Sequence, residues 1–527
     1  MNFPLLLPQF LKRAVKLYGH KEAVIGNETS ITYEELNGRV NQLSHGLAEL
    51  GIKKGDRVAY ISNNTPEMLE GFYGVLQLGA VMVPINTRLS LEDFVYILNH
   101  SGAKVLYVDV EHLEKIIQIK DRLTTVETVV SNGDIPNNSN IISYGDFLQR
   151  QSTENVDYFH IDENDLATLL YTSGTTGDPK GVMLTHRNNY LHALSSMHHL
   201  QVSDRDVLLH VLPMFHVNGW GSPFYYTANG ATHVCLNQVR PELIFDKIHK
   251  HGVTVMHMAP TVLNSILDYA EKNNVPKTTH PIRIFVAGAA PPLAFIKRVE
   301  STLNWKFVQV YGMTETSPLI TYSDIRVTQK DLPEEEQIEL KAKTGYEFIG
   351  SEVKVVKDNG EEVNKDGTDV GEIIVRGTGV MKGYWKDPEA TEETIRDGWL
   401  YTGDLAVVYP DENIAIVDRK KDIIISGGEN ISSLEIESVF YDHPAVNEVA
   451  IIAAPHEKWG ETPLAVVAKR EGYENTTETE LIEYARSRLA HFKAPRKVEF
   501  IDSLPKNGNG KVMKHHLRRD LIDQPTV

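Results

Sequence analysis

A short segment between two apolar runs combines glycines, hydroxyl side chains and a lysine. It reads Tyr171-Thr172-Ser173-Gly174-Thr175-Thr176-Gly177-Asp178-Pro179-Lys180-Gly181. Glycines let backbone N–H groups approach an oxyanion closely, and the hydroxyls and the lysine supply further donors. The flanking runs, Leu166–Leu170 and Val182–Leu184, predict strand, loop, strand. We interpret the loop as a cradle for polyphosphate.

Two observations count against this interpretation when the segment is taken alone. Runs of Ser, Thr and Gly are often flexible surface loops. The spacing also differs from the common P-loop, which places Gly-Lys-Ser/Thr directly before a helix. The order of later motifs favours the phosphate site: Tyr311-Gly312-Met313-Thr314-Glu315-Thr316, then Tyr401-Thr402-Gly403-Asp404, then Gly508-Asn509-Gly510-Lys511.

In this order the four motifs resemble the adenylate-forming superfamily of acyl-CoA synthetases, adenylation domains and beetle luciferases, over nearly the whole chain. The resemblance implies ATP-dependent conversion of a carboxylic acid to an acyl-AMP, followed by transfer to coenzyme A. A carboxylate that attacks an α-phosphate brings two anions together, so the site must supply positive charge. Mg²⁺ and lysine are the usual sources of that charge.

Glu315 follows an apolar strand and a turn, where a carboxylate can hold Mg²⁺ together with phosphate oxygens. Read alone, Thr314-Glu315-Thr316 is more typical of a helix start. The resemblance implies that Glu315 is the magnesium ligand, with Thr172 as a further candidate. It also implies that the following residues bind ATP or AMP: Thr172, Ser173, Gly174, Thr175, Thr176, Gly177, Lys180, Gly288, Ala289, Ala290, Tyr311, Gly312, Met313, Thr314, Asp404 and Arg419.

Among these, Asp404 and Arg419 match ribose contacts, Tyr311 matches an aromatic residue that lies against adenine, and Thr314 matches a threonine that contacts phosphate. Taken alone, Asp404 could equally be a turn residue. Gly288-Ala289-Ala290 by itself means only a close backbone approach.

Lys511 matches the catalytic lysine of the superfamily, which bridges the attacking carboxylate and the α-phosphate. Similar enzymes then rotate the small domain about a hinge, which here is Lys421; a hinge residue at the end of an element can absorb such a change. Ala494 stands where relatives carry a basic CoA contact. The resemblance implies that CoA is bound by Gly427, Gly428 and Trp459.

His216 lies in Leu212-Pro213-Met214-Phe215-His216-Val217-Asn218-Gly219-Trp220, where similar synthetases border the carboxylate and the acyl chain. A histidine after a strand is otherwise often only hydrogen-bonded structure. The expected acyl wall is Trp220, Val286 and Met313. No aspartate occurs in residues 215–221, which weakens an amino-acid substrate. The resemblance is strongest to medium- and long-chain fatty acyl-CoA ligases, with aryl or short-chain acids as the alternative.

Two rival functions remain open. One is an adenylation enzyme that loads a separate carrier protein, since no carrier domain is expected after residue 527. The other is a non-catalytic sensor of nucleotide or acyl groups. Joint retention of Glu315, Asp404 and Lys511 argues against the sensor.

Composition narrows the class further. The 527 residues are too many for one hydrophobic core, so at least two domains are expected. A net charge of −18 argues against nucleic acid as a partner. The single cysteine, Cys235, excludes an internal disulfide. We find no secretion signal and no apolar run of about 20 residues, so the expected location is the cytoplasm without a transmembrane segment. A homodimer is a hypothesis by analogy.

The elements that must position these residues alternate between strand and helix patterns up to about residue 330, which predicts largely parallel sheets with helices on both faces. Expected strands include Arg57–Ile61, Asp206–Leu212, Arg283–Val286 and Leu405–Val408. The fold class is therefore α/β, and ligands are expected beyond the carboxyl ends of the strands. We predict a large domain, 1–419, of doubly wound sheets with a small β-barrel-like subdomain, followed by a compact, mobile α+β domain, 420–527.

Overall fold

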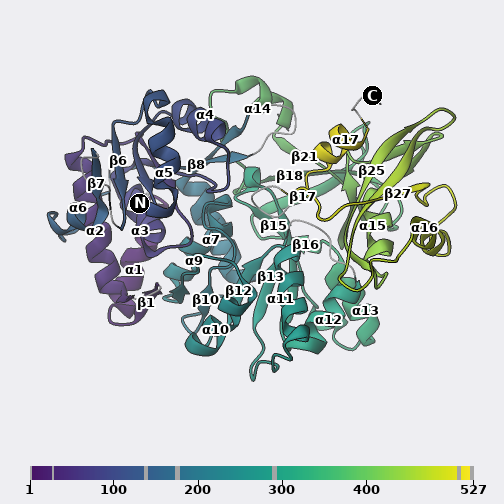
Figure 1. Ribbon diagram of the computed structural model, residues 1–527. Helices are drawn as coiled ribbons and strands as arrows, with labels where there is room; N and C mark the ends of the chain where they lie inside the picture. The colour runs from purple at the N-terminus through teal and green to yellow at the C-terminus, as the bar shows by residue number, and fades with distance from the viewer. Residues whose placement is uncertain are drawn as a thin grey trace.

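The computed structural model describes residues 3–26, 29–133, 135, 140–158, 160–172, 178–287, 293–506 and 512–522. Four β-sheets with covering helices confirm the predicted α/β class. In Figure 1 the chain runs from the purple N-terminal part on the left, through the teal elements below, to the yellow-green C-terminal part on the right. The last of the four sheets lies in that C-terminal part.

An eight-stranded sheet forms most of the first part of the chain. The pairs that join β4, β3, β5, β6 and β7 are parallel, and β9 turns back antiparallel to β8. In order across the sheet, the strands are β19 (Gly383–Tyr384), β9 (Lys180–Thr185), β8 (Leu166–Thr172), β4 (Val81–Pro84), β3 (Arg57–Ile61), β5 (Ala103–Val108), β6 (Thr128–Ser131) and β7 (Ile141–Ser143).

Helices cover both faces of this sheet because successive side chains of a strand point to opposite faces. On β3, Val58 and Tyr60 pack in one hydrophobic cluster, whereas Ala59 and Ile61 pack in another. The first cluster receives α2 (Tyr33–Glu49), α3 (Pro66–Gly74) and α6 (Tyr144–Gln149), and the second receives α4 (Leu91–Ser101) and α5 (Val110–Ile119). The segment Thr32-Tyr33-Glu34-Glu35 has the sequence pattern of a capping box, and the structure forms one. Thr32 and Glu35 satisfy each other's backbone N–H groups at the start of α2.

A nine-stranded sheet follows, and its central strands are parallel. In order they are β16 (Tyr346–Glu347), β15 (Leu319–Ser323), β14 (Lys306–Gly312), β13 (Arg283–Val286), β12 (Val255–Met258), β10 (Val207–Leu209), β11 (Thr232–Val234), β1 (Glu22–Ile25) and β2 (Ser30–Thr32). Strand β10 is shorter than the predicted Asp206–Leu212, because the chain leaves the sheet after Leu209 to form a loop.

The helices around this second sheet divide between its two faces. Helices α10 (Pro241–His251), α11 (Pro260–Lys272), α12 (Leu293–Leu303) and α13 (Glu334–Ala342) contribute side chains to one cluster with the sheet. Helices α1 (Pro8–Tyr18), α7 (His186–His199), α8 (Val217–Trp220) and α9 (Ser222–Ala228) contribute to the large cluster shared with the first sheet. The two large sheets are thus joined through one apolar core.

A third, antiparallel sheet corresponds to the predicted change of pattern after residue 340. Its strands are β17 (Ser351–Val356), β18 (Gly371–Gly377), β21 (Trp399–Val408), β20 (Ile395–Arg396) and β22 (Ile414–Arg419), with α14 (Pro388–Thr394) beside them. Strand β21 is longer than the predicted Leu405–Val408. Asp404 is therefore a strand residue, paired with Arg419, rather than the turn residue that the sequence alone allowed.

The fourth sheet has its own core. Its strands are β24 (Glu429–Ile431), β23 (Ile424–Ser426), β26 (Gly460–Lys469), β25 (Val446–His456) and β27 (Lys497–Phe500), covered by α15 (Ser433–Tyr441), α16 (Glu478–Arg486) and α17 (Lys514–Leu521). Between β22 and this sheet, Asp418 accepts a hydrogen bond from Ser433 N at 2.5 Å, and Arg518 pairs with Asp422 at 2.8 Å. The domain boundary at residue 419 stays a prediction.

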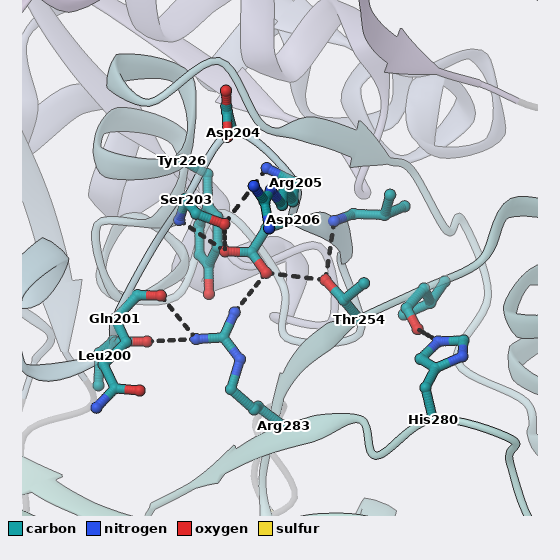
Figure 2. A network of polar contacts seen from close by, with 12 residues as sticks. Leu200, Gln201, Ser203, Asp204, Arg205, Asp206, Tyr226, Thr254, His280 and Arg283 are labelled. Atoms are coloured by element: carbon teal, nitrogen blue, oxygen red, sulfur yellow. Dashed lines mark hydrogen bonds and ion pairs between the residues drawn. The ribbon is translucent and has the colours of Figure 1, made fainter.

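A buried ion pair holds the nine-stranded sheet to α7 at the end opposite the carboxyl ends of its strands (Figure 2). The Arg283 guanidinium pairs with Asp206 and donates to the carbonyl oxygens of Leu200 and Gln201 at 2.5 and 3.0 Å. Thr254 Oγ1 donates to the same carboxylate at 2.9 Å. The Asp206 side chain is only 6% exposed, so removing the cation would leave its charge uncompensated.

We predict that Arg283→Met lowers the free energy of unfolding by about 3 kcal/mol, the range found when one partner of a buried pair is removed. Arg376 is the matched control, because it pairs with Glu352 while both side chains are about half exposed. Arg376→Met should cost less than about 1 kcal/mol. Urea unfolding of both variants measures the difference in the free energy of unfolding. Equal losses in the two variants would show that burial does not make the Arg283–Asp206 pair more important for stability than an exposed pair.

Candidate active site

The carboxyl end of β14 meets the third sheet at a carboxylate. Tyr311, near the end of β14, donates its hydroxyl to Asp404 Oδ2 at 2.8 Å. The antiparallel pairing of β21 with β22 sets Asp404 opposite Arg419, whose Nε lies 3.4 Å from Asp404 Oδ1. The structure therefore brings together Tyr311, Asp404 and Arg419, which the sequence assigned to adenine and ribose.

Gly312 is required by a close backbone approach directly after Tyr311. A Cβ at this position would lie 1.7 Å from the carbonyl oxygen of Pro318. Because this oxygen belongs to the backbone, no side-chain rotation could relieve the clash. Met313 N donates to the same carbonyl oxygen at 3.1 Å. The chain can thus turn back sharply and place the buried residues Thr314 and Glu315 near Asp404 and Arg419.

Glu315 is a buried carboxylate with a tyrosine partner that the sequence did not predict. Tyr384 donates its hydroxyl to Glu315 Oε1 at 2.9 Å. Burial raises the pKa of Glu315, while the Tyr384 hydrogen bond and the charge of Arg419 act in the opposite direction. The charge of Asp404 also raises that pKa, so the two carboxylates of the site repel each other.

Tyr384 also connects this carboxylate to the phosphate-loop strand. The ammonium group of Lys180 lies 5.2 Å from the centroid of the Tyr384 ring and 3.9 Å from Asp387 Oδ2. Lys180 pairs with Thr172 across the β8–β9 hairpin, and β19, which carries Tyr384, pairs with β9. The only sequence signal for Tyr384 was its place in Gly383-Tyr384-Trp385, an aromatic pair without strand or helix periodicity.

The donor set at Glu315 fits a magnesium ion that is shared with a nucleotide. No group of three or more His, Cys, Asp or Glu side chains forms a metal cluster among the described residues. Mg²⁺ in phosphate sites commonly takes one or two carboxylates and completes its shell with phosphate oxygens and water. A cation here would also offset the burial of Glu315 and its repulsion by Asp404.

Three groups of predicted site residues lie outside the described residues. They are Ser173, Gly174, Thr175, Thr176 and Gly177 of the phosphate loop, Gly288, Ala289 and Ala290 of the adenine segment, and Lys511. On either side of the segment that contains Lys511, Lys506 and Val512 form an antiparallel bridge. Their assignments stay predictions.

The segment 210–221, which we call the acyl loop, follows β10 and has an unusual backbone. Val217, Asn218 and Trp220 have φ values of 44°, 49° and 59°, and the intervening Gly219 and the following Gly221 are also left-handed. His216, partly buried, precedes this turn. Non-glycine residues, above all a β-branched valine, rarely adopt this conformation, and such strain concentrates at functional sites.

The three residues predicted as the acyl wall do not share one cluster. Trp220 is 5% exposed and stacks on His257 with ring centroids 5.6 Å apart. Trp220 belongs to the large core and Met313 packs against it, whereas Val286 belongs to the cluster on the other face of the nine-stranded sheet. The structure thus brings Trp220 and Met313 to one core and assigns Val286 to another.

In the fourth sheet, two residues predicted to bind CoA touch each other. Gly427 N donates to Trp459 O at 2.8 Å, and a Cβ on Gly427 would lie 2.8 Å from the indole ring. Nothing lies within 4 Å of a Cβ built on Gly428. The predicted hinge residue, Lys421, has its pKa lowered by partial burial and then by the charges of Arg419 and Arg518.

These features define a class of enzyme. Two α/β sheets share one core, a smaller sheet domain follows, and a tyrosine–aspartate–arginine group lies beside a buried glutamate at the carboxyl end of a strand. This combination is that of an adenylate-forming enzyme, as the motif order predicted.

Comparison with known families assigns the chain to the same class of enzyme. The chain matches the AMP-binding enzyme family over residues 11–385 and the AMP-binding enzyme C-terminal domain over residues 435–511. It therefore belongs to this family and is an AMP-forming acid–thiol ligase that uses ATP and CoA. The predicted superfamily and enzyme class are confirmed.

Individual relatives are similar along nearly the whole chain. A peroxisomal benzoate–CoA ligase of Arabidopsis thaliana is 39% identical over 98% of this chain and 93% of that enzyme. A 4-hydroxybutyrate–CoA ligase of Metallosphaera sedula is 39% identical over 97% of this chain and 93% of that enzyme. The crystal structure of an anthranilate CoA ligase with anthranoyl-AMP has a TM-score of 0.90 at 25% identity, covering 99% of this chain and 98% of that one.

None of the described helices combines the length and the apolar content that crossing a lipid bilayer requires.

We predict that Gly312→Ala weakens ATP binding at least about tenfold, because a clash with a backbone carbonyl must displace Tyr311 or Thr314 by a large fraction of an ångström. Gly145, in α6, is the matched control, since a Cβ there has no neighbour within 4 Å. Calorimetric titration with ATP compares the two folded variants. Unchanged ATP affinity in Gly312→Ala would mean that the turn after β14 does not position the nucleotide.

Proposed function

We propose that this enzyme joins a small carboxylic acid, short-chain or aryl, to coenzyme A through an acyl-adenylate. The observation that carries the proposal is Trp220, whose buried indole stacks on His257 and would close the acid pocket at a short depth. The benzoate and 4-hydroxybutyrate substrates in the names of the two relatives support the same choice. They favour the short-chain and aryl alternative over the medium- or long-chain acid that the motif resemblance ranked first.

In the first half-reaction, the acid carboxylate attacks the α-phosphate of ATP and pyrophosphate leaves. Asp404 would accept hydrogen bonds from the ribose hydroxyls once Tyr311 and Arg419 have oriented it. Glu315, oriented by Tyr384, would hold Mg²⁺, which supplies positive charge to the phosphate oxygens. Lys511 would bridge the carboxylate and the α-phosphate and so reduce their repulsion.

In the second half-reaction, the CoA thiol displaces AMP from the acyl carbon. The small domain would rotate about Lys421, withdraw Lys511 and bring the Gly427–Gly428 turn to the site. Gly428 would leave room for pantetheine, because nothing lies within 4 Å of a Cβ built there. The space beside Gly427 is taken by the indole of Trp459, which would offer an aromatic surface to the CoA nucleotide. The backbone near the hinge is compatible with such a change, because Lys421 lies between two elements, β22 and β23.

Location and assembly stay predictions. The cytoplasm was expected, whereas the Arabidopsis relative is named as peroxisomal. A homodimer rests on analogy alone. The carrier-protein alternative predicts AMP release with a carrier and without CoA, which separates it from the proposed reaction.

The acid preference can be tested with a panel of benzoate, butyrate, 4-hydroxybutyrate, octanoate and palmitate, measured by pyrophosphate release with and without CoA. We expect the three small acids to be preferred. Trp220→Gly should raise kcat/KM for octanoate about tenfold or more, since glycine keeps the left-handed turn while the indole is removed. Trp399→Gly in the third sheet is the control. A wild-type preference for palmitate, or an unchanged panel in Trp220→Gly, would contradict the proposal.

The two half-reactions can be separated by substitutions in the C-terminal region. We predict that Lys511→Ala reduces acyl-AMP formation about 100-fold or more, while CoA still reacts with supplied acyl-AMP. Lys497→Ala, which removes an exposed lysine, should leave both steps unchanged.

Lys421→Pro should slow thioester formation much more than adenylation, because proline fixes φ at the hinge. The turn hydrogen bonds from Asp422 N and Ile423 N to Arg419 O can persist in this variant. Single-turnover measurements of each step distinguish the variants. Equal loss of both steps in Lys421→Pro would argue against the hinge.

A further inference from the structure

Asn64 is a buried asparagine that links one large sheet to the acyl loop of the other. It lies between β3 and α3 of the eight-stranded sheet and is 4% exposed. Its Nδ2 donates to His210 O at 2.6 Å and to Leu212 O at 3.1 Å. Its Oδ1 accepts from Met214 N at 2.7 Å. One amide side chain thus satisfies three backbone groups of the acyl loop.

These three contacts fall where the loop has just left its sheet. Strand β10 ends at Leu209, and His210 N still donates to Val234 O of β11 at 2.9 Å. Asn64 binds the carbonyl oxygens of His210 and Leu212 and the N–H of Met214. An amide that both donates and accepts reproduces the pairing a strand would offer. Asn64 therefore sets the path of the chain immediately before His216 and the left-handed turn.

The left-handed turn itself needs external support. Val217, Asn218 and Trp220 are non-glycine residues at positive φ, and such a conformation persists only where the surroundings hold it in place. Asn218 Nδ2 donates to Thr168 Oγ1 at 3.1 Å and to Asn189 Oδ1 at 3.2 Å. These contacts hold the middle of the turn against β8 and α7.

A further contact holds the chain just beyond the acyl loop, at Pro223 near the start of α9. Tyr73, in α3, is fully buried and donates its hydroxyl to Pro223 O at 2.8 Å. Asn64 and Tyr73 thus hold the loop before and after the turn from the same strand–helix unit, β3 and α3. The position of Trp220 therefore depends on residues of a sheet that carries none of the predicted acid-binding side chains.

We propose that Asn64 is a positioning residue that sets acid selectivity by holding the acyl loop in its strained form. The proposal rests on the proposed function, in that the acyl loop must border the acid. When the hydrogen bonds of Asn64 to the acyl loop are lost, the left-handed turn relaxes and Trp220 moves. The pocket then no longer discriminates between acids by their size. ATP binding depends on Tyr311, Asp404 and Glu315, none of which contacts Asn64 through the hydrogen bonds described.

The test compares Asn64→Ala with Asn41→Ala in the full-length enzyme. Asn41, in α2, is 1% exposed and likewise bridges other segments of the chain. Its Nδ2 donates to Thr153 O at 3.0 Å, and its Oδ1 accepts from Gln77 Nε2 at 3.2 Å. We expect Asn64→Ala to lower the butyrate-to-octanoate ratio of kcat/KM about tenfold, with the KM for ATP nearly unchanged. Asn41→Ala should leave the ratio unchanged.

Two further variants sharpen the test. Asn64→Asp retains the acceptor for Met214 N but sets a carboxylate against two carbonyl oxygens, so it should disturb the ratio more than Asn64→Ala. Tyr73→Phe removes only the hydroxyl that holds Pro223 O and should lower the ratio in the same direction. Tyr73→Phe decides the question if the Asn64 variants do not fold.

The outcomes separate this inference from the proposed function. Suppose that Trp220→Gly changes the acid preference while Asn64→Ala and Tyr73→Phe leave the butyrate-to-octanoate ratio unchanged. The positioning role of Asn64 is then overturned, whereas the proposal that Trp220 borders the acid is retained. If Trp220→Gly also changes nothing, the acyl loop does not border the acid, and both ideas fail. Equal rises in KM for acid and ATP, matched by Asn41→Ala, would show a general structural effect and overturn the positioning role.

Discussion

The site depends on holding two buried carboxylates close to the place where more negative charge must arrive. Glu315 and Asp404 repel each other, and burial raises the pKa of Glu315. Tyr384, Tyr311 and Arg419 offset this penalty by donating to them or by lying close with positive charge. The chain supplies hydrogen-bond donors to these carboxylates rather than a full set of cations. This arrangement leaves the carboxylates available for the metal ion and the ribose that the proposed mechanism assigns to them.

The arrangement of sheets follows from that requirement. β14 delivers Tyr311 and Glu315 from the nine-stranded sheet, the third sheet delivers Asp404 and Arg419, and β19 on the eight-stranded sheet delivers Tyr384. Three separate sheets therefore meet at one pair of carboxylates. The shared hydrophobic core of the two large sheets gives the rigid frame that such convergence needs.

The acid side of the site is built differently. The acyl loop is irregular backbone with strained φ values, and two side-chain amides outside the loop hold it in place. They belong to Asn64, which follows β3 of the eight-stranded sheet, and to Asn189 of α7. A pocket wall of this kind can change between relatives without changes in the nucleotide contacts. The benzoate and 4-hydroxybutyrate substrates named for similarly distant relatives are consistent with that separation.

Local signals in the sequence determined the class of fold and the family, and the motif resemblance proposed the residues of the nucleotide site. The capping box at Thr32 could be read from the sequence, because helix caps depend on residues a few positions apart. The motif order singled out Asp404 together with Tyr311 and Arg419, but it singled out Glu315 without its partner Tyr384. Only the tertiary structure paired Glu315 with Tyr384, 69 residues away, and Asn64 with Met214, 150 residues away. Such contacts follow from how sheets pack, and no periodicity along the chain records them.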